Sequence, residues 1–363
     1  MAVSTEAVRA ALANLADPNT GKDYVSTRCV KNIRIDGSDL SLDIELGYPA
    51  RTQFDEIRRA VIAQLRSIPA IGNISVNVIT NIVAHTVQRG LKPLPGVKNI
   101  IAVASGKGGV GKSTTAVNLA LALAQEGATV GLLDADIYGP SQPQMLGLLG
   151  QKPESSDGVS MDPLHAHGLQ AMSIGFMIDI DSPMVWRGPM VTQALEQLLK
   201  QTNWQDVDYL VVDMPPGTGD TQLTLAQKVP VTGAVIVTTP QDIALIDARK
   251  GLKMFEKVGI PILGLVENMS IHICPQCGHE EHLFGRGGGE QMCRDYGTDL
   301  LGALPLEMSI RELTDAGQPT VVGAPQSRAA GIYRSIARRL AVKIAERARD
   351  MSAKFPSIVV QNT

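Results

Sequence analysis

The chain has few cysteines, few aromatic side chains and no long apolar run. Only four of its 363 residues are Cys, and only 4% are aromatic. Four clustered cysteines do not suit the disulfide framework of a secreted protein, so a reducing, cytoplasmic compartment is expected. The scarcity of aromatic side chains argues against a stacking surface for single-stranded nucleic acid. The apolar runs have the length of strands and are far too short to span a membrane.

The net charge is also small. The 33 basic and 36 acidic side chains leave a formal charge of −3, and 44% of the residues are hydrophobic. This composition is typical of a folded globular protein. Because no overall positive field exists, neither nucleic acid nor a stable membrane association is expected among the partners.

Two patterns of apolar residues divide the chain into domains. Residues 1–88 predict a small α+β domain, and residues 89–98, with two Pro and two Gly, predict a linker. Residues 99–363 contain continuous apolar runs between helical segments, which indicates a mainly parallel sheet sandwiched by helices. In the first domain we expect helices at 4–15 and 54–68, and strands at 30–35, 40–46 and 74–79. In the second we expect strands at 100–104, 130–134, 169–172, 209–213, 234–239, 262–267 and 300–303.

The strongest motif is a glycine-rich segment that follows the strand at 100–104. Residues 106–114, GKGGVGKST, fit the pattern G-x-x-x-x-G-K-[ST] before a helix expected at 115–125. Glycines let the backbone N–H groups approach phosphates at the positive end of a helix. Lys112 is expected to reach the β- and γ-phosphates of ATP, and the Ser113 hydroxyl to bind Mg²⁺. The expected nucleotide-binding residues are Gly106, Lys107, Gly108, Gly109, Val110, Gly111, Lys112, Ser113 and Thr114.

Two more strands end in acidic residues. Asp136 lies just after the strand at 130–134, and Asp213 ends the strand at 209–213, before a glycine-rich loop that contains Gly217. Alone, each carboxylate would more often cap a helix or lie in solvent. In this chain order, together with the phosphate-binding loop, the two favour a magnesium site.

A cysteine pair follows in the sequence C-P-Q-C-G. Cys274 and Cys277 can form a tight turn that presents two thiolates to one metal, half of the set that zinc or an iron–sulfur cluster needs. Three completions are open. His279, His282 or Cys293 could complete a zinc site within the chain, or the two thiols could cycle as a disulfide. The pair could also meet its symmetry mate in a homodimer.

The spelling of these motifs resembles the Mrp/ApbC family. The segment KGGVGKS, with its extra lysine, is similar to the deviant Walker A loop of the MinD, ParA and nitrogenase iron protein class. Residues 1–88 are similar to the iron–sulfur-assembly domain that is fused to many family members. The other matching motifs are DADIYGPS at 134–141, DMPPGTGD at 213–220, ENMS at 267–270 before the cysteine pair, and FGRGGGE at 284–290.

The resemblance implies a P-loop NTPase that binds iron–sulfur clusters and transfers them to apo-proteins. Slow, magnesium-dependent hydrolysis of ATP would act as the switch. It implies that Lys107 reaches across a homodimer to the partner's phosphates, a catalytic role beside that of Lys112. It also implies that Asp136 orients the attacking water or a magnesium-bound water.

The resemblance assigns four further residues. Asp213 would hold Mg²⁺ through water, Gly217 would follow the γ-phosphate, and Asn268 would contact adenine. Cys274 and Cys277 would be the ligands of a cluster, expected to be [4Fe–4S], that bridges two copies of the chain. Zinc binding and redox cycling remain alternatives, since spacing alone does not separate them.

One departure and one alternative function accompany the resemblance. The segment GYPAR, residues 47–51, lacks the cysteine that the family's N-terminal domain usually has there, which puts a cluster-related role of this domain in doubt.

The alternative function is a partitioning or division ATPase acting on membrane or DNA, with the cysteine pair as a structural zinc site. Its support is a basic helix expected at 331–355, with Ile332, Ile336, Leu340 and Ile344 on one face. Packing of that face against the sheet would explain the same pattern.

Overall fold

The computed structural model describes residues 4–69, 71–85, 91–178 and 188–353, and it contains two compact units. The first unit comprises residues 1–83 together with 125–127, and the second comprises the rest. Residues 89 and 90 of the expected linker lie outside the described residues, and strand β4 already begins at Val97.

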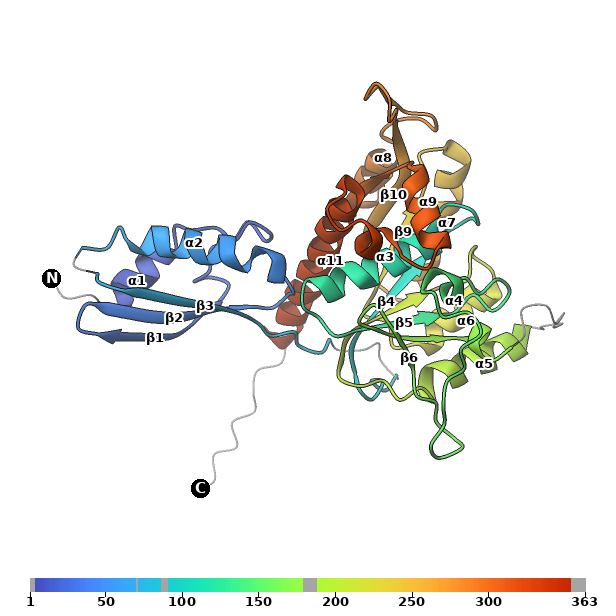
Figure 1. Ribbon diagram of the computed structural model, residues 1–363, viewed down its shortest axis with the longest axis horizontal. Coiled ribbons are helices and arrows are strands. Elements are labelled where there is room, and N and C mark those ends of the chain that lie inside the picture. The colour runs from blue at the N-terminus through green and yellow to red at the C-terminus, as the bar shows by residue number, and fades with distance from the viewer. Residues whose placement is uncertain (1–3, 70, 86–90, 179–187, 354–363) are drawn as a thin grey trace. The chain divides into compact units, whose positions relative to one another are not determined.

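The first unit is a three-stranded sheet with two helices on one face (Figure 1). Strand β2 alternates buried and more exposed side chains, as a sheet with one packed face requires. It is antiparallel to β1, with which it forms a hairpin, and parallel to β3, and the two strands expected at 30–35 and 40–46 are present. The elements are α1 (Thr5–Leu12), β1 (Val30–Asp36), β2 (Asp39–Leu46), α2 (Phe54–Leu65) and β3 (Ile74–Thr80).

The second unit is built on a nine-stranded, mainly parallel sheet, which confirms the predicted fold class. Its order is β11-β10-β9-β4-β8-β5-β7-β6, with β12 beside β10. The central strands are buried on both faces because helices cover both sides. The strands are β4 (Val97–Ala104), β5 (Val130–Asp134), β6 (Leu164–Ala166), β7 (Leu169–Ser173), β8 (Val207–Asp213), β9 (Gly233–Thr238), β10 (Ile262–Ile273), β11 (Glu280–Glu281) and β12 (Leu300–Pro305).

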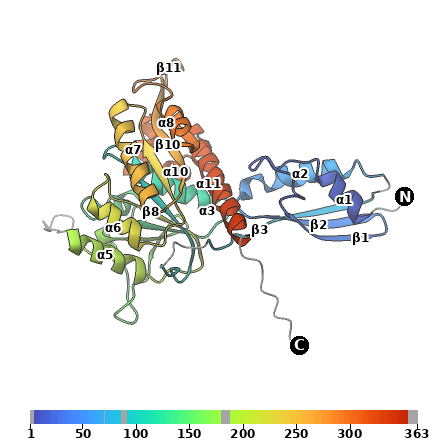
Figure 2. The ribbon, with the colours of Figure 1, turned by 180° about the vertical axis from the view of Figure 1, so that it is seen from behind.

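Helices cover the two faces of this sheet. Helices α3 (Lys112–Gln125) and α11 (Arg328–Ala353) lie on one face (Figure 1), whereas α5 (Gly188–Lys200), α6 (Asp220–Lys228) and α7 (Asp242–Lys257) lie on the other (Figure 2). No helix among the described residues is both long enough and apolar enough to span a bilayer. The remaining helices are α4 (Gln142–Met145), α8 (Gly288–Tyr296), α9 (Met308–Asp315) and α10 (Thr320–Gly323).

Strand β10 is longer than its apolar pattern predicts. We expect a strand that ends at Glu267, but the strand continues to Ile273. The extension alternates polar and apolar residues, and its last two, His272 and Ile273, pair with β11 in an antiparallel hairpin. The prediction was therefore wrong at this end, and the consequence is that Cys274 directly follows the strand.

Candidate functional site

The glycine-rich loop and two acidic strand ends lie at one edge of the second sheet. Parallel pairing places Val103 of β4 beside Asp213 of β8, and Asp134 of β5 beside the same Asp213. The carboxyl ends of parallel strands are where ligands bind in open α/β sheets, because the loops that follow them meet there. Helix α3 begins at Lys112, so the N-terminus of the helix points into this site.

Gly111 of the loop is held against Asn268 of β10. Its φ is +81°, a left-handed conformation that favours glycine, and a Cβ atom there would collide with the Asn268 amide. The Asn268 Nδ2 donates a hydrogen bond of 2.9 Å to the Val110 carbonyl and is buried. The structure thus places Asn268 against the loop backbone. Asn268 is a residue of β10 itself, whereas the sequence predicts that this strand ends at Glu267.

Lys112 forms a buried ion pair with Asp213. The Lys112 side chain is 6% exposed and that of Asp213 is fully buried. The ammonium also donates to Ser113 Oγ over 3.2 Å. Of the residues expected to bind ATP and Mg²⁺, the structure therefore brings Lys112, Ser113 and Asp213 together.

Two residues that the sequence left without a role join this group. Asp134 is buried, and its carboxylate accepts hydrogen bonds from the backbone N–H of Asp136 (3.1 Å) and of Gln142 (3.0 Å). Burial, together with the nearby Asp213 carboxylate, raises the pKa of Asp134 to about 7. Gln142 is also buried, and its Nε2 donates to Asp213 Oδ2 (2.9 Å) and to the Ser113 carbonyl (3.2 Å). The DADIYGPS motif contains Asp134 and ends just before Gln142, but no periodicity marks Gln142.

Three further residues that the sequence predicts for the site are Asp136, Gly217 and Lys107. Burial raises the pKa of Asp136, although the backbone N–H groups of Tyr138 and Gly139 stabilise its carboxylate. Gly217 has a φ of +98° and donates its N–H to the Ser105 carbonyl over 2.9 Å, which ties the loop after β8 to the glycine-rich loop. The Lys107 side chain is exposed and forms no ion pair with any described residue.

The chemistry of this donor set fits a nucleotide with Mg²⁺. Backbone N–H groups, a helix N-terminus and Lys112 suit phosphates. The Ser113 hydroxyl and the Asp213 carboxylate are the hard oxygen ligands that Mg²⁺ prefers.

The cysteine pair lies at the tip of the β10–β11 hairpin, which projects from one end of the second sheet (Figures 1 and 2). The turn is closed by hydrogen bonds of 2.9 Å from the Cys274 N–H to the His279 carbonyl and from the Gly278 N–H to the Cys274 carbonyl. Cys274 is half-buried, Cys277 is exposed, and both are free thiols. Hydrogen bonds from the backbone N–H groups of Cys277 and Gln276 lower the pKa of Cys274.

The described residues offer no third ligand for a zinc site within one chain. They contain no group of three or more His, Cys, Asp or Glu side chains that could hold a metal ion. Cys293 is buried in α8, where burial raises its pKa to about 11. The His282 Nδ1 is hydrogen-bonded to the Ser270 carbonyl over 2.8 Å.

The apolar face of α11 is packed inside the second unit. Ile336, Leu340 and Ile344 are each at most 2% exposed. Among the basic side chains, Lys343 pairs with Asp299 and Arg339 donates to the Leu301 carbonyl. This packing removes the main support for a helix that lies on membrane or DNA.

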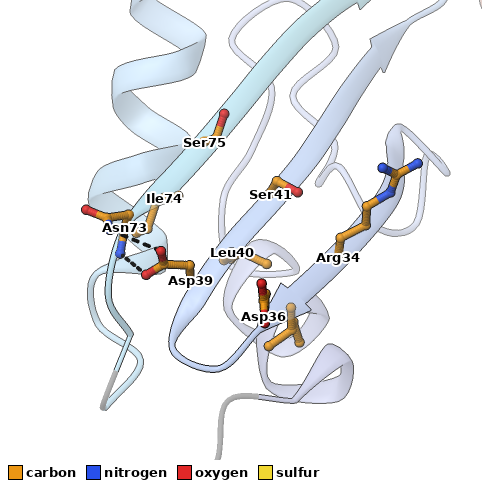
Figure 3. A pocket seen from close by; sticks show the side chains of 9 residues that line it. Arg34, Asp36, Asp39, Leu40, Ser41, Asn73, Ile74 and Ser75 are labelled. Carbon is orange, nitrogen blue, oxygen red and sulfur yellow. Dashed lines mark hydrogen bonds between the residues drawn. The ribbon is translucent and has the colours of Figure 1, made fainter.

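The first unit shows a hollow of mixed polar and apolar lining beside the turn between β1 and β2 (Figure 3). Asp39 accepts hydrogen bonds there from the backbone N–H (2.9 Å) and the Nδ2 (3.1 Å) of Asn73. In the segment 47–51, which lacks the family's usual cysteine, Tyr48 is buried and donates its hydroxyl to Asp17 over 2.7 Å. Neither this hollow nor the segment 47–51 contains a thiol. The hollow is lined by Arg34, Ile35, Asp36, Asp39, Leu40, Ser41, Asn73, Ile74 and Ser75.

Two family models match the chain. Residues 96–341 match the ParA model, described as NUBPL iron-transfer P-loop NTPase. Residues 5–78 match a model described as iron–sulfur cluster assembly protein. Both matches agree with the resemblance that the motifs indicate.

Curated relatives match over most of the chain. An iron–sulfur cluster carrier protein of Escherichia coli K12 is 51% identical over 347 residues, which is 94% of each chain. The iron–sulfur cluster transfer protein NUBPL of Mus musculus is 55% identical over 255 residues, 69% of this chain and 80% of its own.

Solved structures match the second unit. A nucleotide-binding protein of Archaeoglobus fulgidus in complex with ADP is 36% identical, with a TM-score of 0.56 over 64% of this chain and 90% of its own. The cell division ATPase MinD of Pyrococcus furiosus is 23% identical, with a TM-score of 0.50 over 67% of this chain and 98% of its own, a likeness of fold.

Proposed function

The chain belongs to the ParA family of iron-transfer P-loop NTPases, and we propose that it binds an iron–sulfur cluster and transfers it to apo-proteins under the control of ATP. The cluster is the cargo, and Cys274 and Cys277 are its ligands. ATP binds and is hydrolysed at the glycine-rich loop. The proposed location is the cytoplasm, where thiols stay reduced, and none of the four cysteines forms a disulfide in the described residues.

One observation carries the proposal: a single strand connects the nucleotide site to the cysteine pair. Asn268 of β10 donates to the Val110 carbonyl of the loop, and Cys274 follows six residues later at the end of the same strand. Between them, Met269 has a φ of +56°, and the register between β10 and β12 shifts there. A change in the loop is therefore transmitted along β10 to the thiols.

The nucleotide part of the proposal follows from the donor set. A triphosphate bound by the loop backbone brings oxygen atoms to the Lys112 ammonium, so Lys112 exchanges Asp213 for phosphate. Ser113 would hold Mg²⁺ directly, and Asp213 would hold it through water. When bound, the ion neutralises the charge of the phosphates. Asp136 orients the attacking water, and hydrolysis is proposed to be slow.

The cluster part of the proposal requires a second copy of the chain. Two thiolates are half of the four that a [4Fe–4S] cluster takes, and in the described residues no other metal-binding group stands beside them. A two-fold axis supplies the matching pair. The same homodimer would bring the exposed Lys107 of each copy to the phosphates bound by the other.

We propose a small N-terminal domain at residues 1–88, a linker at 89–98 and an ATPase domain at 99–363. The N-terminal domain is not proposed to bind a cluster of its own. The segment 47–51 contains no cysteine, and Cys29 is buried.

The test is cluster transfer from the loaded full-length chain to an apo iron–sulfur enzyme whose activity reports the cluster. We expect recovery of the client's activity, at a rate that changes when ATP and Mg²⁺ are added. The Lys112→Ala variant should transfer at one rate with or without ATP. Equal rates for the wild type in both conditions would refute the ATP switch, and absence of any transfer would refute the carrier function.

A further inference from the structure

Gln142, the first residue of α4, is a buried carboxamide that joins three parts of the nucleotide site. It is 1% exposed. Its Nε2 donates to Asp213 at the end of β8 and to the Ser113 carbonyl at the start of α3, and its backbone N–H donates to Asp134 at the end of β5. Neither the motifs nor the family comparisons assign a role to this side chain.

The orientation of the carboxamide follows from its partners. Asp213 Oδ2 and the Ser113 carbonyl can only accept hydrogen bonds, so the atom facing them is the nitrogen. The other atom, Oε1, is then an acceptor. It is buried and receives no hydrogen bond from any described residue. A buried acceptor without a donor is costly in an ordinary interior, and such groups are found where a ligand or its water supplies the partner.

The two oxygens of Asp213 are held by different groups. Lys112 pairs with Oδ1 and Gln142 donates to Oδ2. In the proposed function Lys112 leaves Oδ1 for the phosphates, and Gln142 is then the remaining side chain on the Asp213 carboxylate among those described here. The carboxylate keeps its orientation only if Gln142 stays.

We propose that Gln142 is a positioning residue for the magnesium-bound nucleotide. It fixes Asp213 so that Oδ1 faces the ion's water shell, it restrains the Ser113 backbone, and it offers Oε1 to a water of that shell. Partners that orient the groups around a metal typically contribute a factor of about 10–100 to metal affinity. This inference rests on the proposed nucleotide function of the same site.

The experiment compares ADP binding with Mg²⁺ and with a chelator, by calorimetry on the full-length chain. The variant is Gln142→Met, which keeps the length and volume of the side chain and removes both hydrogen-bonding atoms. The matched control is Gln144→Met in the same helix, because Gln144 is exposed and its Nε2 donates to the Asp315 carbonyl, away from Asp213.

We expect Gln142→Met to lose about tenfold or more of the affinity gained from Mg²⁺, with unchanged affinity in chelator. Gln144→Met should match the wild type in both. A Gln142→Met variant that matches the wild type in both conditions overturns the inference. Equal losses with and without Mg²⁺ overturn it too, because Gln142 would then only support the loop.

Two further measurements keep the outcome decisive. Gln142→Asn keeps the amide but shortens its reach, so it should show the same magnesium-specific loss if the methionine variant does not fold. A wild-type chain that binds ADP without any gain from Mg²⁺ would overturn the proposed ATPase function itself. If Mg²⁺ raises the ADP affinity of the wild type and of Gln142→Met equally, only the proposed role of Gln142 is refuted.

Discussion

Lys112 of the glycine-rich loop and Asp213 at the end of β8 form a buried ion pair at the centre of the nucleotide site. The pair joins the residue expected to hold phosphate to the residue expected to hold magnesium. Because both side chains are buried away from water, the charge of each residue compensates the charge of the other. The two proposed site residues are also structural partners, which gives a prediction for stability that does not depend on activity.

Removing the charge of Asp213 should destabilise the fold. Asp213→Asn removes the carboxylate that pairs directly with the buried Lys112 ammonium, a loss that typically costs about 3–5 kcal/mol. The measurement is urea-induced unfolding without nucleotide. The control is Asp315→Asn, which removes an exposed partner of Arg311 and should change the free energy of unfolding by less than about 1 kcal/mol. Similar values for the two variants would show that the buried pair does not stabilise the unit.

The role of Lys107 across a dimer can be tested by mixing two inactive variants. Lys107→Ala should reduce hydrolysis by at least about 100-fold, as loss of a charge that stabilises the transition state does, and leave ADP affinity unchanged. Lys112→Ala should be inactive as well. An equal mixture should recover about a quarter of the wild-type rate per subunit, because half of the dimers are mixed and each has one complete site.

Absence of recovery in the mixture would show that Lys107 acts within its own chain. Lys250→Ala is the control, since Lys250 is an exposed lysine of α7 paired with Asp247, and it should hydrolyse ATP as the wild type does.

The phosphate-binding loop could be predicted from the sequence because its chemistry depends on neighbours in the chain. Spacing alone fixes Gly111, Lys112 and Ser113 relative to one another. Asp134 and Gln142 could not be assigned in this way. They reach Asp213 only through the register of β5 and β8 and through the turn after β5, which are properties of the folded sheet.

The length of β10 is a second feature that could not be predicted from the apolar pattern. The continuous apolar run that predicted the strand ends at Glu267, and the alternating residues 268–273 extend it in the folded protein, where His272 and Ile273 pair with β11. The connection between Asn268 and Cys274 was therefore hidden in the sequence, although both residues were singled out.

That connection gives a prediction for coupling. Asn268→Ala removes the hydrogen bond to the Val110 carbonyl and leaves the cysteine pair intact. We expect cluster binding at the wild-type level but a transfer rate that no longer responds to ATP. The control is Ser270→Ala on the same strand, whose hydroxyl donates to the Leu304 carbonyl and not to the loop. If Asn268→Ala responds to ATP as fully as the wild type, the coupling does not run through this contact.

The four cysteines should differ in reactivity. Cys274 should react with iodoacetamide at pH 7, because backbone N–H groups lower its pKa and a lower pKa raises its thiolate fraction. Its rate should level off at a lower pH than that of an ordinary thiol. Cys293, with its pKa raised to about 11, should stay unmodified until the chain is unfolded. Mass spectrometry of the peptides gives both results, and rapid labelling of Cys293 in the native protein would contradict them.

The central claim is that Cys274 and Cys277 hold an iron–sulfur cluster between two copies of the chain. Its most direct test is anaerobic reconstitution with iron and sulfide, followed by visible absorbance, iron and sulfide analysis and the mass of the complex. The wild type and the Cys293→Ala control should form a dimer with one cluster, and Cys274→Ala/Cys277→Ala should form none. A cluster that survives in the double variant, or a wild type that holds zinc in place of the cluster, would contradict the account.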